Sequence, residues 1–155
     1  MTPAIDVLKQ ASASYRLHRY AHIAGATDFG LEAVQALGQE ADRIFKTLVV
    51  ELTPKEVVVA CVPVSATLNL KSLASACGAK KAMIAQPSKV PGITGYILGA
   101  VSPIGQKQSL QTLIDRSATL HTTIFISGGR RGLEIEITSD ALLALCSGRL
   151  ADLAA

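Results

Sequence analysis

One lysine lies inside a run of residues that otherwise favours a buried strand. Lys46 stands in the segment Ile44-Phe45-Lys46-Thr47-Leu48-Val49-Val50, which is rich in β-branched and aromatic residues. A lysine in such a run either points to water or brings its ammonium group to a partner or a cavity. In the second case the ammonium group can hold a substrate carbonyl or carboxylate. Spacing alone leaves both interpretations open.

Glycine and proline bracket a second candidate, the segment Gly99-Ala100-Val101-Ser102-Pro103. We predict that it ends a strand over 96–101 and continues as Ile104-Gly105-Gln106-Lys107. Glycine lets a backbone approach a ligand closely, proline stiffens the turn, and N–H groups in such a loop can bind an ester oxygen or a carboxylate. A plain turn is the alternative. The segment is not a Walker phosphate loop, because GxxxxGK[ST] does not occur.

A third candidate is Ser127-Gly128-Gly129-Arg130-Arg131-Gly132, which joins two predicted strands. Three glycines and two arginines in one loop can form a nest for an anion. The same residues also suit a glycine-rich hairpin turn with solvated arginines. Both interpretations remain open from the sequence.

Metal and nucleophile motifs are weak throughout. His18 and His22 are four residues apart, but their region is predicted to run from a strand into a loop, and His121 is isolated. The sequence has neither a CxxC pair nor a GxSxG motif. We therefore expect no metal and no other cofactor. A hydrolase of this kind would depend on positioning and oxyanion stabilisation.

Size and composition favour one folded domain over residues 1–155. Hydrophobic residues make up 49% of the chain and charged residues 17%, which argues against disorder. Three widely spaced cysteines favour a reducing, cytoplasmic location. The N-terminus MTPAIDVLKQ does not resemble a signal peptide, and the longest apolar stretch, 57–64, is too short to cross a membrane.

Basic residues dominate the middle of the chain. Asp115 is the only acidic residue between Val57 and Leu133. The same stretch contains the basic residues Lys71, Lys80, Lys81, Lys89, Lys107, Arg116, Arg130 and Arg131. This distribution suggests a face for a polyanion, although scattered lysines that aid solubility are an equal alternative. Aromatic residues are only 4%, so phosphate contacts should dominate any binding of RNA.

Local signals predict the elements that must position these candidates. Thr2 and Pro3 should start a helix, and further helices should begin at Thr27 or Asp28, at Asn69 and at Ser139. Strand-like segments are predicted at 15–20, 45–52, 57–62, 96–101, 122–127 and 133–138. Two pairs of them read as hairpins, and strands do not alternate regularly with helices. These features predict an α+β fold with a mixed or antiparallel, barrel-like sheet and flanking helices.

Several of these segments together resemble the YbaK family of free-standing Cys-tRNA(Pro) deacylases, which is related to the editing domain of bacterial prolyl-tRNA synthetases. The resemblance covers essentially the whole chain. It rests on Phe45 to Val49, Gly99 to Lys107, Ser127 to Leu133, Thr2 to Ala4, Thr27 to Gly30 and Leu68 to Lys71. Each motif is modest, but their order and spacing together are specific.

The resemblance implies a mixed barrel-like sheet and the removal of a wrong amino acid from proline tRNA. It implies that Lys46 is the essential lysine, with Thr47 beside it, and that the Gly99–Pro103 backbone (Gly99, Ala100, Val101, Ser102, Pro103) holds the aminoacyl ester. It places Tyr20, Phe29, Ser127, Gly128 and Arg130 at the pocket, together with Glu134, where the family commonly has aspartate. The partners implied are tRNA and prolyl-tRNA synthetase.

Three functional hypotheses follow. In the leading one the thiol of a wrongly attached cysteine attacks its own ester, which accounts for the lack of a protein nucleophile. In the second, water attacks another amino acid, such as alanine. In the third, the chain binds tRNA or a synthetase without catalysis, as the basic middle of the chain would allow.

Overall fold

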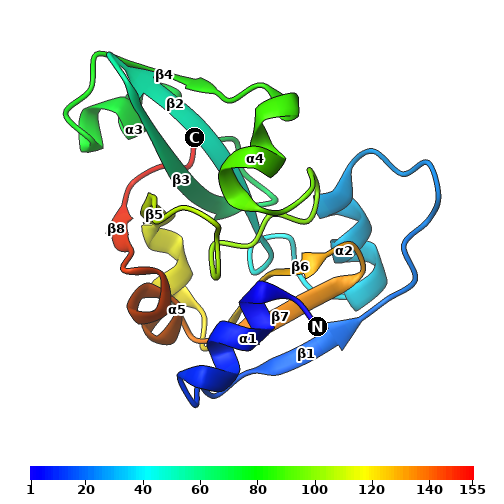
Figure 1. The fold of residues 1–155 in the computed structure, drawn as a ribbon. Helices are drawn as coiled ribbons and strands as arrows, with labels where there is room; N and C mark the ends of the chain where they lie inside the picture. The colour runs from blue at the N-terminus through cyan, green and yellow to red at the C-terminus, as the bar shows by residue number, and fades with distance from the viewer.

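The computed structural model describes all residues from 1 to 155, and its strands form two sheets (Figure 1). The helices are α1 (Pro3–Gln10), α2 (Phe29–Leu37), α3 (Leu70–Ala76), α4 (Val90–Thr94) and α5 (Ser139–Cys146), with 3-10 turns η1 (Pro87–Lys89) and η2 (Arg116–Leu120). The strands are β1 (Arg16–Arg19), β2 (Phe45–Thr53), β3 (Glu56–Pro63), β4 (Lys81–Ile84), β5 (Gln111–Asp115), β6 (Ile124–Arg130), β7 (Leu133–Ile137) and β8 (Arg149–Ala151).

The smaller sheet has the order β1-β7-β6 and is antiparallel throughout. The larger sheet has the order β4-β2-β3-β5-β8, with antiparallel pairs on the β4 side and parallel pairs on the β8 side. A single bridge between Ile44 and Phe125 joins the two sheets. The predicted α+β class with a mixed sheet is therefore confirmed, although the sheets do not close into a barrel.

Capping residues at the helix starts explain why these short helices form. The Thr2 Oγ1 atom accepts the Ile5 N–H group, and Pro3 occupies the first position of α1. Asp28 and Asn69 cap α2 and α3 in the same way. The prediction for the last helix was one residue off, because its cap is Thr138 and Ser139 is already helical.

The predicted strand over 96–101 is wrong. Gly95 and Gly99 both have φ near +80°, which breaks an extended chain, and the Tyr96 hydroxyl donates to the carbonyl of Ile104 at 2.6 Å. These local bonds fold the segment into a loop. The strands β5 and β8, which complete the parallel side of the larger sheet, were not predicted from the sequence.

Two main clusters of buried side chains hold the elements together. One lies between the two sheets and includes Leu8, Phe45, Val59, Ile114 and Ile135. The other lies under α3, where strand residues of the larger sheet pack against Leu68, Leu73 and Leu153. No helix is both long and apolar enough to span a bilayer.

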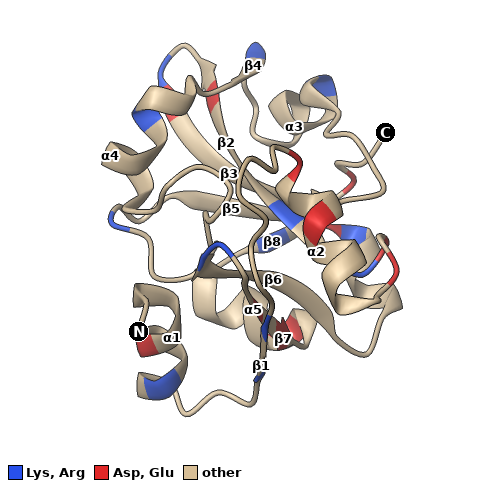
Figure 2. Cartoon of the chain, turned by 90° about the vertical axis from the view of Figure 1, so that its right-hand side faces the viewer, with Lys and Arg blue, Asp and Glu red and all other residues tan.

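Basic residues of the middle of the chain are spread over several elements (Figure 2). Lys89 pairs with Glu51 at 3.2 Å, and Arg116 pairs with Asp152 at 3.1 Å. The sole acid of this stretch, Asp115, accepts backbone N–H groups from Ser117, Leu153 and Ala154. Asp115 therefore binds backbone groups of neighbouring segments and forms no ion pair with a surface lysine.

Candidate active site

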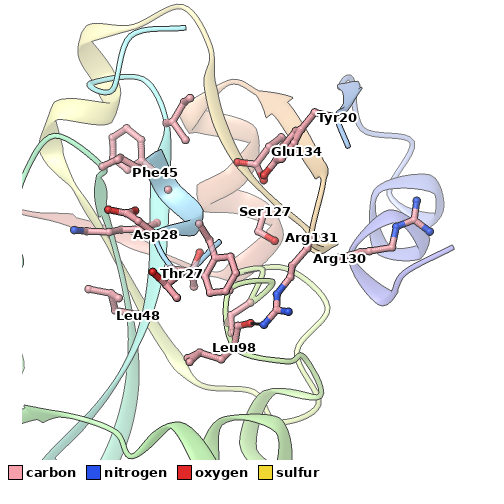
Figure 3. A pocket seen from close by; sticks show the side chains of 18 residues that line it. Tyr20, Thr27, Asp28, Phe45, Leu48, Leu98, Ser127, Arg130, Arg131 and Glu134 are labelled. Carbon is pink, nitrogen blue, oxygen red and sulfur yellow. Dashed lines mark hydrogen bonds between the residues drawn. The ribbon is translucent and has the colours of Figure 1, made fainter. Parts of the chain in front are cut away.

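A cavity of about 450 Å³ opens beside the first half of β2. β4 pairs with β2 only from Val50 to Thr53, so the preceding residues of β2 have an uncovered edge, and Phe45 to Leu48 line the cavity. The other walls come from the start of α2, the loop around Gly99 and the β6–β7 hairpin (Figure 3). The site thus lies at the junction of the two sheets.

Lys46 is half-buried in this wall and has no anionic partner. In the β2–β3 pair it lies opposite Val62, so it has no cross-strand carboxylate. None of the ion pairs or side-chain hydrogen bonds of the protein involves it, although it lines the cavity together with Asp28 and Glu134. An unpaired ammonium group in a concave, partly apolar site is available to a substrate oxygen.

The loop around Gly99 brings backbone donors to the opposite wall. Ala100 N–H donates to the Ile97 carbonyl at 3.0 Å, and Gly99, with φ of +83°, occupies the turn position that requires a positive φ. The N–H groups of Gly99 and Val101 donate to no acceptor within the protein. Both residues line the cavity, and an unbonded backbone N–H group in such a wall can donate to an ester oxygen.

Phe29, at the start of α2, lies directly on this loop. A Cβ atom at Gly99 would overlap the Phe29 ring, so the ring and the loop backbone are in close contact. The Arg131 guanidinium lies over the same ring, 4.5 Å from its centroid, and its Nη2 donates to the Leu98 carbonyl at 2.9 Å. Arg131 therefore ties together α2, the Gly99 loop and the β6–β7 hairpin.

Ser127 and Glu134 form the wall on the smaller sheet, where they are directly opposite each other in the β6–β7 pair. Ser127 Oγ accepts the Gly129 N–H group at 3.2 Å. Glu134 is only 8% exposed and makes no side-chain hydrogen bond, and burial raises its pKa to about 8. The side chain is thus largely protonated at neutral pH until a cation binds beside it.

Tyr20 lies beside Glu134 at the far end of the cavity (Figure 3). Burial raises the pKa of its phenol to about 12, and the nearby carboxylates of Glu134 and Glu32 act in the same direction. Tyr20 thus remains a neutral hydrogen-bond donor. Behind it, His22 Nδ1 lies 2.7 Å from Glu32 Oε1, and this bond lowers the pKa of Glu32.

The structure gathers most of the predicted site residues in this cavity but not all of them. Its lining includes Tyr20, Phe29, Lys46, Thr47, Gly99, Val101, Ser127, Arg130 and Glu134. Four predicted residues do not line it: Ala100, Ser102, Pro103 and Gly128 are buried behind the wall. Ser102, for example, turns its Oγ atom to the Ile104 N–H group at 3.3 Å. These four support the loop and the hairpin from outside the cavity.

Arg130 was predicted to lie at the pocket, whereas Arg131 was not. Figure 3 shows the Arg130 side chain directed away from the cavity, whereas Arg131 reaches Leu98. A bulge between Ser127 and Arg130 shifts the register of β6, so simple alternation does not tell which arginine faces inward. The other lining residues that were not selected are Thr27, Asp28, Gly30, Ile44, Phe45, Leu48, Val64 and Leu98.

Cysteine and histidine side chains are absent from the cavity lining. Cys61 is fully buried, and burial raises its pKa to about 12. His18 lies 2.8 Å from Glu136 and His22 pairs with Glu32, so the two imidazoles have separate carboxylate partners. No three His, Cys, Asp or Glu side chains are grouped closely enough to hold a metal ion.

The aminoacyl-tRNA editing domain model matches residues 27–145, which contain every cavity residue except Tyr20. The chain belongs to the aminoacyl-tRNA editing family. A relative in this family, from Enterococcus faecalis (strain ATCC 700802 / V583), is named "Putative Cys-tRNA(Pro)/Cys-tRNA(Cys) deacylase EbsC". It is 35% identical over 153 residues, which cover 98% of this chain and 92% of the relative.

Solved structures share the fold of this chain. One, described as a "putative trans-editing enzyme for prolyl tRNA synthetase", superposes with a TM-score of 0.83 at 23% identity and covers 100% of this editing-family chain and 99% of its own. Another, the hypothetical protein APE2540, gives a TM-score of 0.87 at 24% identity and covers 99% of both chains. The resemblance inferred from the sequence motifs is therefore confirmed at the level of the family and the fold.

Proposed function

We propose that this chain deacylates Cys-tRNA(Pro), with Lys46 as its central residue. The observation that supports this most is that the unpaired Lys46 lines the same cavity as Gly99 and Val101, whose N–H groups have no acceptor within the protein. These are the groups needed to hold an aminoacyl ester and to stabilise negative charge on its carbonyl oxygen. The relative that is 35% identical is named for the same substrate class.

The attacking group in this proposal is the thiol of the substrate. Its sulfur forms a bond to the ester carbonyl carbon, the bond from that carbon to the ribose oxygen breaks, and the thiol proton goes to the leaving oxygen. The products are a cyclic thiolactone and free tRNA. The cavity supports this route because its lining offers no cysteine or histidine, and the hydroxyls of Thr47 and Ser127 have contacts within the protein.

One carboxyl group and two aromatic rings suit the remaining parts of the substrate. The Glu134 carboxyl group, largely desolvated and without a partner, is suited to receive the substrate's α-ammonium group, which would restore its charge. Tyr20 and Phe29 close the ends of the cavity around the small side chain. We propose that residues 1–155 act as one deacylase domain in the cytoplasm and that prolyl-tRNA synthetase supplies the tRNA choice.

The decisive experiment measures deacylation of Cys-, Ala- and Ser-tRNA(Pro) by wild-type protein and by Lys46→Ala. We expect Cys-tRNA(Pro) to be the best substrate. Ser-tRNA(Pro) should react far more slowly, because a hydroxyl replaces the attacking thiol. Lys46→Ala should lose on the order of 10²–10³ in rate. Lys55→Ala removes an exposed lysine from the β2–β3 turn and serves as the matched control.

Two results would overturn the proposal. The first is deacylation no faster than in buffer for every substrate, and the second is full activity in Lys46→Ala. Equal rates for Cys- and Ala-tRNA(Pro) would instead identify water as the attacking group. Saturable tRNA binding without turnover would identify a binding protein.

A further inference from the structure

A second concave surface lies between α3 and β4, away from the cavity. It encloses about 540 Å³ and is lined by small or apolar side chains together with Lys71, Lys80 and Lys81. No aspartate or glutamate lines it, and none of the three ammonium groups takes part in an ion pair. We call this surface the α3–β4 groove. Figure 2 shows basic residues on α3 and close to β4 at this end of the molecule.

The positions of these lysines are fixed by the fold. Lys81 is the first residue of β4 and lies opposite Thr53 of β2, while the Lys80 N–H group donates to the Thr53 carbonyl at 3.3 Å. Lys71 stands in the first turn of α3, whose buried side chains Leu73 and Ala74 pack on the same sheet. The groove is therefore held by a strand pair and a packed helix and does not depend on a loose segment.

β2 connects the α3–β4 groove with the candidate active site. Lys46 and Thr53 belong to the same strand and are seven residues apart, which corresponds to about 24 Å at ~3.4 Å per residue. A chain of stacked nucleotides covers this distance in about seven units at ~3.4 Å each. A nucleic acid whose 3′ end enters the cavity is thus long enough for its backbone to reach the groove.

We infer that the α3–β4 groove binds phosphate groups of the acceptor arm of the tRNA whose aminoacyl end occupies the cavity. The inference rests on the proposed function for the identity of the nucleic acid. Three unpaired ammonium groups in a groove without acidic residues complement a polyanion, and the floor of small side chains lets a backbone approach closely. Such contacts are insensitive to sequence, so the groove contributes affinity and orientation while leaving tRNA choice to other contacts.

The test compares a groove variant with a charge-matched control. The groove variant is Lys71→Gln, Lys80→Gln and Lys81→Gln together. The control is Lys9→Gln, Arg16→Gln and Arg19→Gln, which removes three exposed charges from α1 and β1. Binding of uncharged tRNA(Pro) is measured by fluorescence anisotropy at several salt concentrations. Deacylation is measured on Cys-tRNA(Pro) and on the cysteine ester of adenosine, which has no acceptor arm.

We expect the groove variant to bind tRNA at least tenfold more weakly. The slope of the logarithm of its binding constant against the logarithm of the salt concentration should be smaller in magnitude by about two to three. Its KM for Cys-tRNA(Pro) should rise while its rate on the adenosine ester stays at the wild-type value. The control variant should match wild type within about twofold. The melting temperature checks that all variants are folded.

Several outcomes would overturn the inference. These are unchanged affinity and slope in the groove variant, an equal loss in the control, or no tRNA binding by wild type at low salt. A slower reaction with the adenosine ester would show that the substitutions damage the cavity. If the groove variant keeps its tRNA affinity but its deacylation rate no longer rises when prolyl-tRNA synthetase is added, the groove binds a protein instead. The binding arm uses uncharged tRNA, so it can succeed even where deacylation fails.

Discussion

The Phe29 ring packs against the backbone of Gly99 and also stacks against the Arg131 guanidinium, whose carbon lies 4.5 Å from the ring centroid. The three residues come from α2, the Gly99 loop and the β6–β7 hairpin, which are far apart in the sequence. This stack fixes the distance between the loop backbone and the rest of the cavity. Its members should therefore affect substrate binding even where they do not contact the reacting bond.

Gly99→Ala should damage the site severely. The new Cβ atom would overlap the Phe29 ring, and the backbone φ of +83° disfavours any residue with a side chain. We expect KM for Cys-tRNA(Pro) to rise and kcat to fall, with an overall loss of at least about tenfold, and a lower melting temperature. Gly92→Ala is the control, since its Cβ would meet nothing within 4 Å and its φ is not positive. Similar activity in both variants would contradict the role of the stack.

Arg131→Ala and Arg130→Ala should differ strongly although the two residues are neighbours. Arg131 contacts Phe29 and the Leu98 carbonyl, whereas Arg130 has an exposed side chain directed away from the cavity. We expect Arg131→Ala to raise KM about tenfold and Arg130→Ala to change it less than threefold. Arg131→Lys should recover only part of the loss, because an ammonium group cannot stack and donate in the same planar manner. Steady-state kinetics on one substrate preparation decides the comparison.

The buried Glu134 carboxyl group should make stability depend on pH. Its pKa of about 8 in the folded chain lies above the ordinary value of 4.5, so the folded state holds the proton more tightly than the unfolded state. The unfolding free energy should therefore fall as pH rises from about 5 to 8, by a few kcal/mol at most. Glu134→Gln keeps the shape and removes the titration. Urea unfolding at several pH values should show a flatter profile for this variant and greater stability than wild type near pH 8.

Thr2 connects the N-terminus of the chain to the candidate site. Its hydroxyl caps α1 by accepting from Ile5 N–H and donates to the Gly128 carbonyl at 2.6 Å, next to the bulge in β6. Thr2→Ala should lower the free energy of unfolding by about 1–2 kcal/mol. Thr2→Ser keeps the hydroxyl group and should recover most of this loss in urea titrations. Equal destabilisation by serine would point to the lost methyl group.

Elements with local signals were predictable from the sequence, and non-local ones were not. The caps of α1, α2 and α3 and the two hairpins depend on residues a few positions apart. The parallel pairs of β5 with β3 and β8 depend on contacts between distant segments. Short apolar runs in the sequence do not predict such pairs. The loop at Tyr96 was mistaken for a strand because its β-favouring residues outweighed the glycines on either side.

In the candidate site, too, some residues could be predicted from local sequence signals and others could not. Lys46 and Gly99 stand out as residue types at unusual places in the sequence, whereas the role of Arg131 depends on its contacts with Phe29 and Leu98, which are distant in the sequence. Asp28, the N-cap of α2, and Leu48 of β2 line one cavity although they are twenty residues apart in the sequence. No spacing rule links positions that come together through a tertiary contact.

The single bridge between Ile44 and Phe125 has a consequence for how pockets of this type diversify. Each sheet keeps its own hydrogen-bond network, and the cavity is bounded by parts of both. Substitutions on the hairpin side, at Ser127 or Glu134, can therefore alter how the amino group of the substrate is held while Lys46 and its strand remain unchanged. Binding of the amino group and positioning of the ester bond thus depend on different sheets, so that each can change without the other.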